Sequence, residues 1–443
     1  MRVIVIGAGI AGAAAARGLR AQGHEVVVVE SADGVGGRTR TVEVDGFRVD
    51  TGAIFVMGQY DRTLEFLRES GHATAMGRWP ARTAVLADDG RLHRVRFDRP
   101  WTLLGLPQLR LGDRLRMAAR IGRLVLTRGP GPFTLEELAV GDDGTTLSDW
   151  GRRTLGDRGY EYVLRPLMGP LTGADPDVIS AGFARALMHQ VTRTQLTVPA
   201  GGMGAIADWL LQDAGAEVRL SAPARSLAAT DAGIVVGLDD ETLEADGVVV
   251  ATDVRTTTEL LRPVLDPDLT VELERVTPIR TFHVLLGYHR DPWADVPYDL
   301  VVRAGSGRHH DYGVLRNARR APGSAPPGGE TVSVYLDTAQ LAGRDPLEAA
   351  RTAVADTFGP ARADVERVFE LEAGLIAPTP GHYRRMLALR DAMPDRIRLA
   401  GDFLTHSGIE GALRSGDRAA ADLDALAAAT SSASGVAAAP TTV

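Results

Sequence analysis

The first thirty residues alternate between apolar runs and short breaks in the order strand, helix, strand. Arg2 to Ile6 is rich in β-branched residues, which is typical of a buried strand. The alanine-rich stretch after it runs to about Gln22, and Gly23 is placed to end a helix there. Val26 to Val29 is a second apolar run. The chain therefore opens with a β-α-β unit, which predicts a parallel sheet covered by helices.

Farther along the chain, helical and extended patterns form separate blocks. Apolar residues recur near helical spacing among the arginines of 103–126, which predicts a helical block. Short strands are predicted on either side of Asp89-Gly90, a strong hairpin signal, and again between 281 and 337. A valine-rich strand at 245–251 is predicted to return to the first unit. The domain that contains this unit is therefore expected to be discontinuous in sequence.

Three glycines, Gly7, Gly9 and Gly12, stand between the first strand and its helix. This spacing predicts a dinucleotide-binding turn, because the first glycine permits a tight turn, the second lets the backbone approach a pyrophosphate and the third lets helix and strand touch. Free N–H groups at the helix start favour a phosphate there. Glu30 ends the second strand, where its carboxylate is placed to accept hydrogen bonds from ribose hydroxyls. The strand, helix and acid together argue against a signal peptide, which the opening apolar stretch imitates.

Composition narrows the class of protein. The chain of 443 residues is long enough for two domains, with 44% hydrophobic and 24% charged residues. Its net charge of −8, without a basic run, argues against nucleic-acid binding. The absence of cysteine excludes disulfides, thiolate metal sites and a cysteine nucleophile. The 10 histidines show no metal-binding spacing, so no metal is expected. No stretch reads as a transmembrane helix, so a cytoplasmic location is expected.

The residues after Glu30 indicate which dinucleotide cofactor the chain binds. The arrangement E-x(5)-G-G-R-x-x-[ST], ending at Thr41, and the segment Gly52 to Phe55 resemble the FAD-binding amine oxidase superfamily, which includes protoporphyrinogen oxidases and phytoene-type desaturases. The resemblance implies noncovalent FAD, with Arg38 along its pyrophosphate and ribose and residues 52–55 near the flavin. The FAD-binding residues implied in this part of the chain are Gly7, Ala8, Gly9, Ile10, Ala11, Gly12, Glu30, Gly36, Gly37, Arg38, Gly52, Ala53, Ile54 and Phe55.

Two later segments extend the resemblance. Residues 198–252 contain a P-x-G-G-M sequence before a predicted helix, and Ala224 is implied to meet the adenine through its backbone. Near the C-terminus, Asp402 is implied to accept a hydrogen bond from the ribitol. A helix start at Gly411 and Ala412 is implied to direct N–H groups at the flavin, whose reduced form carries negative charge. Gly401 and Ile409 belong to the same motif.

The resemblance also implies the fold. We expect an α/β protein with a Rossmann-like FAD-binding domain of the glutathione-reductase type and an inserted α+β substrate domain. The Ala-, Ser- and Thr-rich end is expected to be a disordered tail. The expected boundaries are 1–80, 195–275 and 385–427 for the FAD-binding domain, 81–194 and 276–384 for the substrate domain, and 428–443 for the tail.

Two departures from the amine oxidases of this superfamily bear on the substrate. All 49 basic residues are arginine, so the lysine that many of these enzymes place near flavin N5 has no counterpart. Gly408 stands where they place a tyrosine, one wall of an aromatic cage. We therefore expect an FAD-dependent oxidoreductase that dehydrogenates a bulky, largely apolar small molecule at a C–C or C–N bond, with O2 or another electron acceptor. An elaborated amine or amide is the alternative substrate, and a non-enzymatic binding protein is the alternative from another class.

Catalytic side chains are harder to assign. His406 is the preferred candidate, because Asp402 and Gly411 bracket it near the implied flavin. The segment Leu103 to Leu126 is predicted to be a helical cap over the substrate pocket, with peripheral contact to a membrane surface as the alternative. Further polar candidates in the substrate domain are Tyr160, Tyr162, Arg165, His189, His283, Tyr312 and Arg316.

Overall fold

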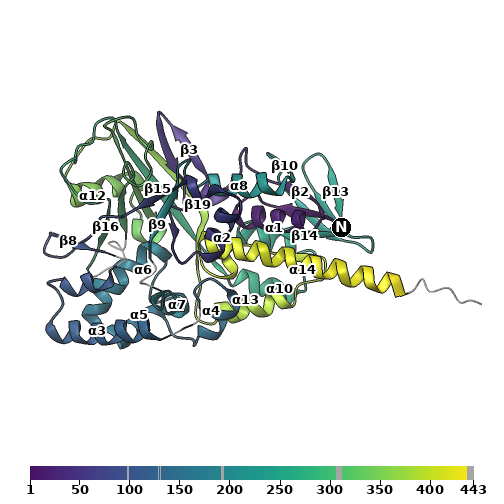
Figure 1. Ribbon diagram of the computed structural model, residues 1–443, viewed down its shortest axis with the longest axis horizontal. Helices are drawn as coiled ribbons and strands as arrows, with labels where there is room; N and C mark the ends of the chain where they lie inside the picture. The colour runs from purple at the N-terminus through teal and green to yellow at the C-terminus, as the bar shows by residue number, and fades with distance from the viewer. Residues whose placement is uncertain (97–98, 128, 130, 191–193, 306–311, 437–443) are drawn as a thin grey trace, which may run out of the picture.

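The opening β-α-β unit lies at the centre of a five-stranded parallel sheet (Figure 1). In this computed structural model, β1 (Arg2–Ile6) pairs with β2 (Glu25–Val29) on one side and with β14 (Gly247–Val250) on the other. Its four residues after Arg2 are buried, because strands flank it and helices cover the sheet. The edges are β10 (Glu217–Arg219) and β20 (Ile397–Leu399). The structure describes residues 1–96, 99–127, 129, 131–190, 194–305 and 312–436.

Small residues bring the helices of this part close together. α1 (Ile10–Ala21) packs against α8 (Ala205–Ala214) and along α14 (Ile409–Val436), as Figure 1 shows. A side chain at Gly416 of α14 would lie 2.9 Å from the Ala14 Cβ of α1. The alanines of α1 therefore serve close helix packing rather than only helix propensity.

A seven-stranded mixed sheet forms the core of the other part of the molecule. Its order is β19-β15-β18-β17-β16-β7-β8. The pair β7 and β8 confirms the hairpin predicted around Asp89-Gly90, with Thr83 opposite Val95. The strands run over Val365–Ala377 (β19), Thr277–Tyr288 (β15), Glu330–Asp337 (β18), Gly313–Arg316 (β17), Leu300–Arg303 (β16), Thr83–Leu86 (β7) and Leu92–Val95 (β8).

Five helices among the described residues lie beside this sheet (Figure 1), and the first of them falls within the helical block predicted at 103–126. They are α3 (Leu111–Leu126), α4 (Leu135–Gly141), α5 (Leu147–Gly159), α6 (Arg165–Thr172) and α7 (Gly182–Met188). The remaining elements are β3 (Thr41–Val44), β4 (Phe47–Asp50), β5 (Val56–Met57), α2 (Asp61–Glu69), β6 (Met76–Trp79), β9 (Leu196–Pro199), β11 (Ser226–Ala229), β12 (Ile234–Gly237), β13 (Thr242–Ala245), α9 (Val254–Leu261), α10 (Pro267–Glu274), α11 (Thr338–Leu341), α12 (Pro346–Phe358) and α13 (His382–Asp391).

The C-terminal helix, α14, continues to Val436, and residues 437–443 lie outside the described part of the chain. Alanine has the highest helix propensity, and a helix that is already formed adds further residues easily. The disorder expected for residues 428–443 stays a prediction.

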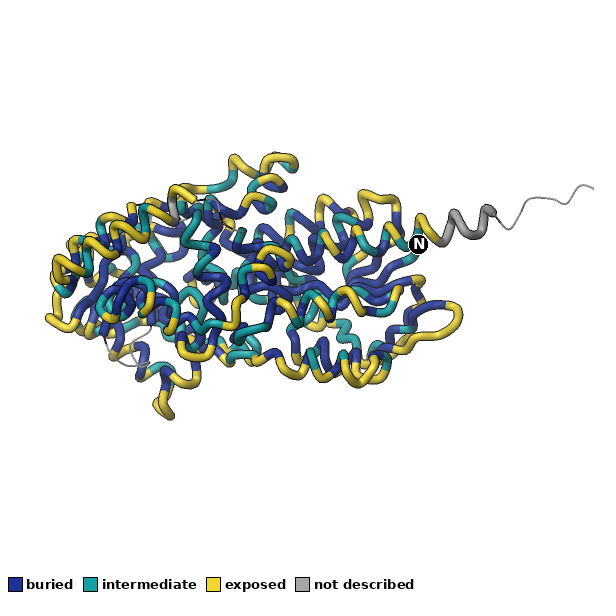
Figure 2. Tube along the Cα trace, turned by 90° about the horizontal axis from the view of Figure 1, so that it is seen from below, coloured by how far each residue is buried: buried dark blue, intermediate teal, exposed yellow. Residues whose placement is uncertain are grey.

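Burial follows the layers of the fold. Figure 2 shows buried residues along the interior and exposed residues on the outer surface. An exception is α3, where Leu111 is 72% exposed, Leu115 63% and Leu126 87%. No helix among the described residues has both the length and the apolar character needed to cross a membrane.

Candidate functional site

One cavity of about 1420 Å³, here called the large cavity, lies where the three motif-bearing segments meet. Ligand pockets usually measure roughly 300–1,000 Å³, so this volume suits a cofactor together with a substrate. Residues from all three segments line it, although Gly7 and Ala412 are more than 400 positions apart in sequence. Those of the sequence-predicted FAD residues that line the cavity are Gly7, Gly9, Ile10, Ala11, Glu30, Gly36, Gly37, Arg38, Gly52, Ala53, Ile54, Phe55, Ala224, Gly401, Asp402, Ile409 and Ala412.

The glycine turn after β1 leaves space for an anion to lie directly against the backbone. Gly7 has φ +103°, and a side chain there would lie 2.7 Å from the Ala251 carbonyl oxygen. Open space surrounds the position that a Gly9 side chain would take, within the large cavity. Gly12 faces away from the cavity, where its missing side chain lets α1 approach the Gly7 carbonyl and Ala251. No side chain caps the start of α1, so its first N–H groups remain for a phosphate.

Glu30 points its carboxylate back toward this turn. Oε2 accepts the Ala8 N–H at 2.7 Å, and Oε1 accepts the Ala32 N–H at 2.9 Å. The buried Ala8 thus orients Glu30 instead of lining the cavity. Oε1 also accepts the Ser31 hydroxyl at 3.2 Å, so one ribose hydroxyl would find the second lone pair of Oε2 open and a second one would take the place of the Ser31 hydroxyl. The loop that carries Ala224 lies beside it, since the Ala222 N–H donates to the Glu30 carbonyl at 2.8 Å.

Arg38 and Asp402 form a two-pronged ion pair across the cavity. Arg38 Nη2 donates to Asp402 Oδ1 at 2.6 Å, and Nη1 donates to Oδ2 at 2.8 Å. Burial lowers the pKa of the Arg38 guanidinium, but the charge and hydrogen bonds of Asp402 outweigh this and leave the pKa raised. The pair joins the first motif to the last one and places a fixed positive charge beside a fixed negative charge.

The start of α14 also lies against the large cavity. Ile409 and Ala412 line it, but the Ala412 N–H donates to the Gly408 carbonyl at 3.1 Å. The N–H groups of the first turn before Ala412 are those that a helix leaves free for an anion. Gly411 faces the opposite side, where a side chain would collide with Thr405 Oγ1, and it lines a separate cavity of about 230 Å³.

The rest of the large cavity is mainly apolar. Two tyrosines that the sequence did not single out, Tyr60 and Tyr335, are part of this wall. Burial raises the pKa of both hydroxyls, so both are neutral hydrogen-bonding groups at ordinary pH. The apolar wall includes Met57, Leu103, Leu164, Leu167, Met168, Leu171, Leu187, Met188, Leu196, Leu300, Val302 and Leu315.

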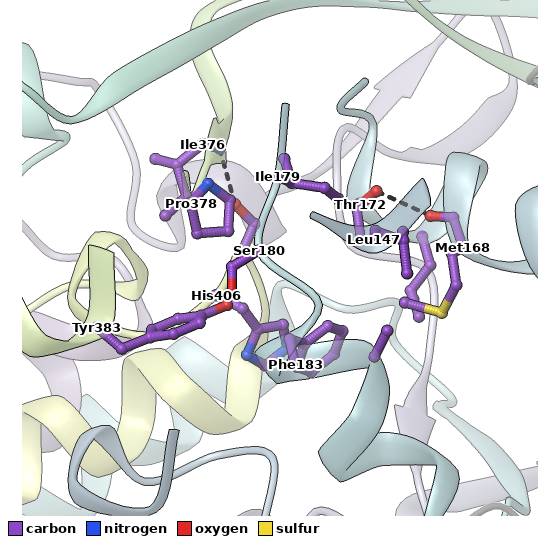
Figure 3. A pocket seen from close by; sticks show the side chains of 13 residues that line it. Leu147, Met168, Thr172, Ile179, Ser180, Phe183, Ile376, Pro378, Tyr383 and His406 are labelled. Carbon is purple, nitrogen blue, oxygen red and sulfur yellow. Dashed lines mark hydrogen bonds between the residues drawn. The ribbon is translucent and has the colours of Figure 1, made fainter. Parts of the chain in front are cut away.

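His406 lies beside the large cavity and does not line it. Its ring stacks on Phe183, with ring centroids 3.8 Å apart, and burial lowers its pKa to about 3. The side chain lines a second, small cavity of about 20 Å³ (Figure 3). The next two residues, Ser407 and Gly408, do line the large cavity. A direct catalytic role for His406 therefore has no support from its position.

The other polar candidates are also held elsewhere. Tyr162 donates to Asp88 at 2.7 Å, His283 bonds Ser333 at 2.8 Å, and Arg316 is buried between Asp291 and Glu330. Tyr160, Tyr162, Arg165, His189, His283, Tyr312 and Arg316 are all absent from the lining of the large cavity.

Comparison with known proteins identifies the family. The profile of the family described as flavin containing amine oxidoreductase matches residues 10–424. The chain belongs to this family. The cofactor of this chain is FAD, as its three motifs imply, and family membership confirms the class of FAD-dependent oxidoreductase.

Individual relatives of this chain differ in the reactions for which they are named. AofH of Mycobacterium tuberculosis, assigned by name as a flavin-containing monoamine oxidase, is 32% identical over 263 residues, 56% of each chain. The match thus spans about half the length of that relative. A 4,4'-diapophytoene desaturase of Staphylococcus aureus is 47% identical over 57 residues, which are 13% of this chain and 11% of the desaturase.

Solved structures confirm the fold of this chain. Cyclohexylamine oxidase from Brevibacterium oxydans superposes with a TM-score of 0.76 over 96% of this chain and 99% of the oxidase, at 20% sequence identity. This likeness covers both the parallel sheet and the seven-stranded sheet, so the expected α/β fold with a Rossmann-like FAD-binding part is correct.

Proposed function

We propose that this protein is an FAD-dependent enzyme that dehydrogenates a bulky, largely apolar small molecule at a C–C or C–N bond and passes the electrons to O2. The observation that carries the proposal is the apolar wall of the large cavity, which adjoins the residues of the FAD motifs. Burial of apolar substrate surface would supply binding energy of roughly 25 cal/mol per Å².

The proposed placement of FAD follows the cavity from one end to the other. Glu30 accepts hydrogen bonds from the adenosine ribose, and the glycine turn with the start of α1 receives the pyrophosphate. Arg38 neutralises phosphate charge, while Asp402 fixes Arg38 and accepts from the ribitol. The first turn of α14 would place the positive end of the helix dipole beside the bound flavin, where it favours negative charge. When bound, FAD supplies the group that accepts a hydride from a C–H bond.

The lining argues against a small cationic amine as substrate. Gly408 lies on the large cavity and offers no ring, and the chain has no lysine at all. Aromatic faces hold a compact ammonium group by cation–π attraction, and Gly408, beside the start of α14, supplies none. Of the two tyrosines of the wall, Tyr335 donates its hydroxyl to the Asp50 carbonyl at 3.4 Å, so Tyr60 is the hydroxyl donor suited to a neutral oxygen or nitrogen of a larger molecule.

An elaborated amine is the second candidate. The similarity to AofH supports it, since that relative is named as a monoamine oxidase. In such a substrate the amine would be a minor part of a large apolar body, and oxidation of its C–N bond would need the same cavity. The third alternative, a non-enzymatic binder, is disfavoured by the retained Arg38–Asp402 pair and the open start of α14, which a pure binding protein has no need to keep.

Anaerobic stopped-flow bleaching of the bound flavin tests the proposal. Benzylamine, tyramine and putrescine should leave the flavin oxidised, whereas a member of a panel of polycyclic, polyene and macrocyclic compounds should reduce it. Fast reduction by any of the three small amines would reject the bulky, apolar substrate. Readmission of air then tests the acceptor, because reoxidation within the turnover time supports O2.

A further inference from the structure

The small cavity behind the flavin-facing turn is enclosed by polar and apolar side chains from distant segments. Tyr383 enters it from α13, His406 and Ser407 from the turn before α14, and Ser180 from the segment between α6 and α7. Figure 3 shows the Tyr383 ring pointing inward toward Ser180. Leucine, isoleucine, methionine and Phe183 side chains make up most of the remaining wall.

Two polar atoms at this cavity are buried without a hydrogen-bond partner among the described residues. They are the hydroxyl oxygen of Tyr383 and Nδ1 of His406. Tyr383 is 0% exposed and His406 6% exposed, so bulk water does not reach them. Buried polar groups in folded proteins are nearly always satisfied by protein or by ordered water. A pair of such atoms at one cavity therefore points to a bound molecule that can both accept and donate hydrogen bonds.

The volume of the cavity fits one water molecule. It measures about 20 Å³, and a cavity needs roughly 10–15 Å³ of this kind of volume to hold a water with its polar partners. We propose that the small cavity binds a single water, which accepts from the Tyr383 hydroxyl and donates to His406 Nδ1. This requires the neutral His406 tautomer with its proton on Nε2.

The proposed water would connect α13 to the turn that faces the flavin. Ser407 lines both cavities, and its Oγ accepts the Ile376 N–H of β19 at 2.9 Å. Tyr383 is thus a positioning residue: through the water and His406 it holds Ser407 and Gly408 against the FAD site. This second part of the inference rests on the proposed placement of FAD, whereas the water site itself does not.

A direct hydrogen bond between the Tyr383 hydroxyl and Asp142 is the alternative to a bound water. Asp142 Oδ2 is another buried atom without a partner in the described chain, and Asp142 Oδ1 accepts the Ser180 hydroxyl at 2.9 Å. A small rotation that brought the Tyr383 hydroxyl onto Asp142 would satisfy both groups without water. The two arrangements differ in what a crystal structure and a hydroxyl deletion would show.

Crystal structures of the FAD-bound wild type and Tyr383→Phe, with thermal melts of both, test the water. We expect one water within hydrogen-bond distance of Tyr383 and His406, its loss in Tyr383→Phe, and a Tm lower by about 1–3 °C. A dry cavity or a direct Tyr383–Asp142 bond would overturn the proposal. So would an unchanged or higher Tm in Tyr383→Phe, because removing a hydroxyl that has no partner relieves the protein of an unsatisfied group.

FAD affinity tests the positioning role. Titration of apoprotein with FAD should give about threefold weaker binding for Tyr383→Phe. Tyr288→Phe is the matched control, because Tyr288 is a buried tyrosine of the other hydrophobic core and should leave FAD affinity unchanged. A bound water with unchanged FAD affinity in Tyr383→Phe would reject the positioning role alone. Failure of the wild type to bind FAD would reject the proposed function and leave the water to be decided by the crystal structure.

Discussion

Replacing Glu30 by alanine should weaken FAD binding at least about tenfold while the fold survives. A hydrogen bond to a charged acceptor contributes about 1.5–3 kcal/mol, and the proposed placement gives Glu30 two ribose hydroxyls. Water entering the truncated site recovers part of that energy. Counting only one bond at the low end of this range leaves about 1.5 kcal/mol, and about 1.4 kcal/mol already corresponds to tenfold in affinity.

The same substitution has a smaller structural cost. Glu30 also accepts the N–H groups of Ala8 and Ala32, and the large cavity lets water replace it there. The free energy of unfolding should therefore fall by only about 1 kcal/mol. Glu30→Gln, which keeps a neutral acceptor, should lose less FAD affinity than Glu30→Ala.

Titration of the apoprotein with FAD, followed by flavin fluorescence, measures the effect. Glu25→Ala is the matched control: Glu25 begins β2, the strand that Glu30 directly follows, its side chain is 68% exposed, and among the described ion pairs it contacts only the surface residue Arg2. It should bind FAD like the wild type. If Glu30→Ala also binds like the wild type, Glu30 is not a ribose ligand and the orientation of FAD in the cavity is wrong.

Three further predictions concern the pH dependence of stability, binding to membranes and the noncovalent attachment of FAD. Burial lowers the pKa of His283 and His406 to about 3 and that of His382 to about 4, so these groups stay neutral in the fold but protonate on unfolding below pH 6.5. The free energy of unfolding is therefore highest above pH 6.5 and decreases as the pH falls toward 4. The decrease is about 2 kcal/mol per histidine between pH 7 and 5. Urea denaturation at both pH values should show a smaller loss for His382→Gln than for the wild type, and equal losses would contradict the shift. Because α3 exposes leucines among arginines, the protein should bind anionic liposomes and rise with them in a flotation gradient. The double variant Leu111→Gln, Leu115→Gln should stay at the bottom of the gradient. Wild-type protein at the bottom would show that α3 is a cap over the substrate pocket and not a membrane contact. Acid precipitation should release all FAD into the supernatant, since the chain has no cysteine, and a yellow pellet would contradict noncovalent binding.

The FAD motifs could be read from the sequence because glycine spacing constrains the backbone directly. Gly7 must adopt positive φ and Gly12 must allow a close approach, whatever the rest of the chain does. The same reasoning could not separate residues that line the cavity from those that support it. Ala8, Gly12 and Gly411 belong to the motifs, yet they orient Glu30, pack α1 and face a different cavity.

The remaining residues of the site could not be predicted, because the sequence does not show in which direction a side chain points. His406 stands between Asp402 and Gly411 in sequence, but the turn directs its ring onto Phe183. Tyr335 lines the large cavity because β18 pairs with β15 in a register that sets Tyr335 opposite His283, and no local pattern specifies that register. The domain boundaries 1–80, 195–275, 385–427, 81–194 and 276–384 stay predictions, although the two large sheets draw their strands from the corresponding segments.

The position of FAD in a crystal structure of the holoenzyme tests the central claim most directly. The account predicts the adenosine ribose within hydrogen-bond distance of Glu30, the pyrophosphate at Gly9 and the start of α1, and the flavin between the first turn of α14 and the apolar wall that includes Met168 and Leu315. The substrate would then have to approach the flavin across that wall. An isoalloxazine ring placed away from α14, or a ribose without contact to Glu30, would contradict the account.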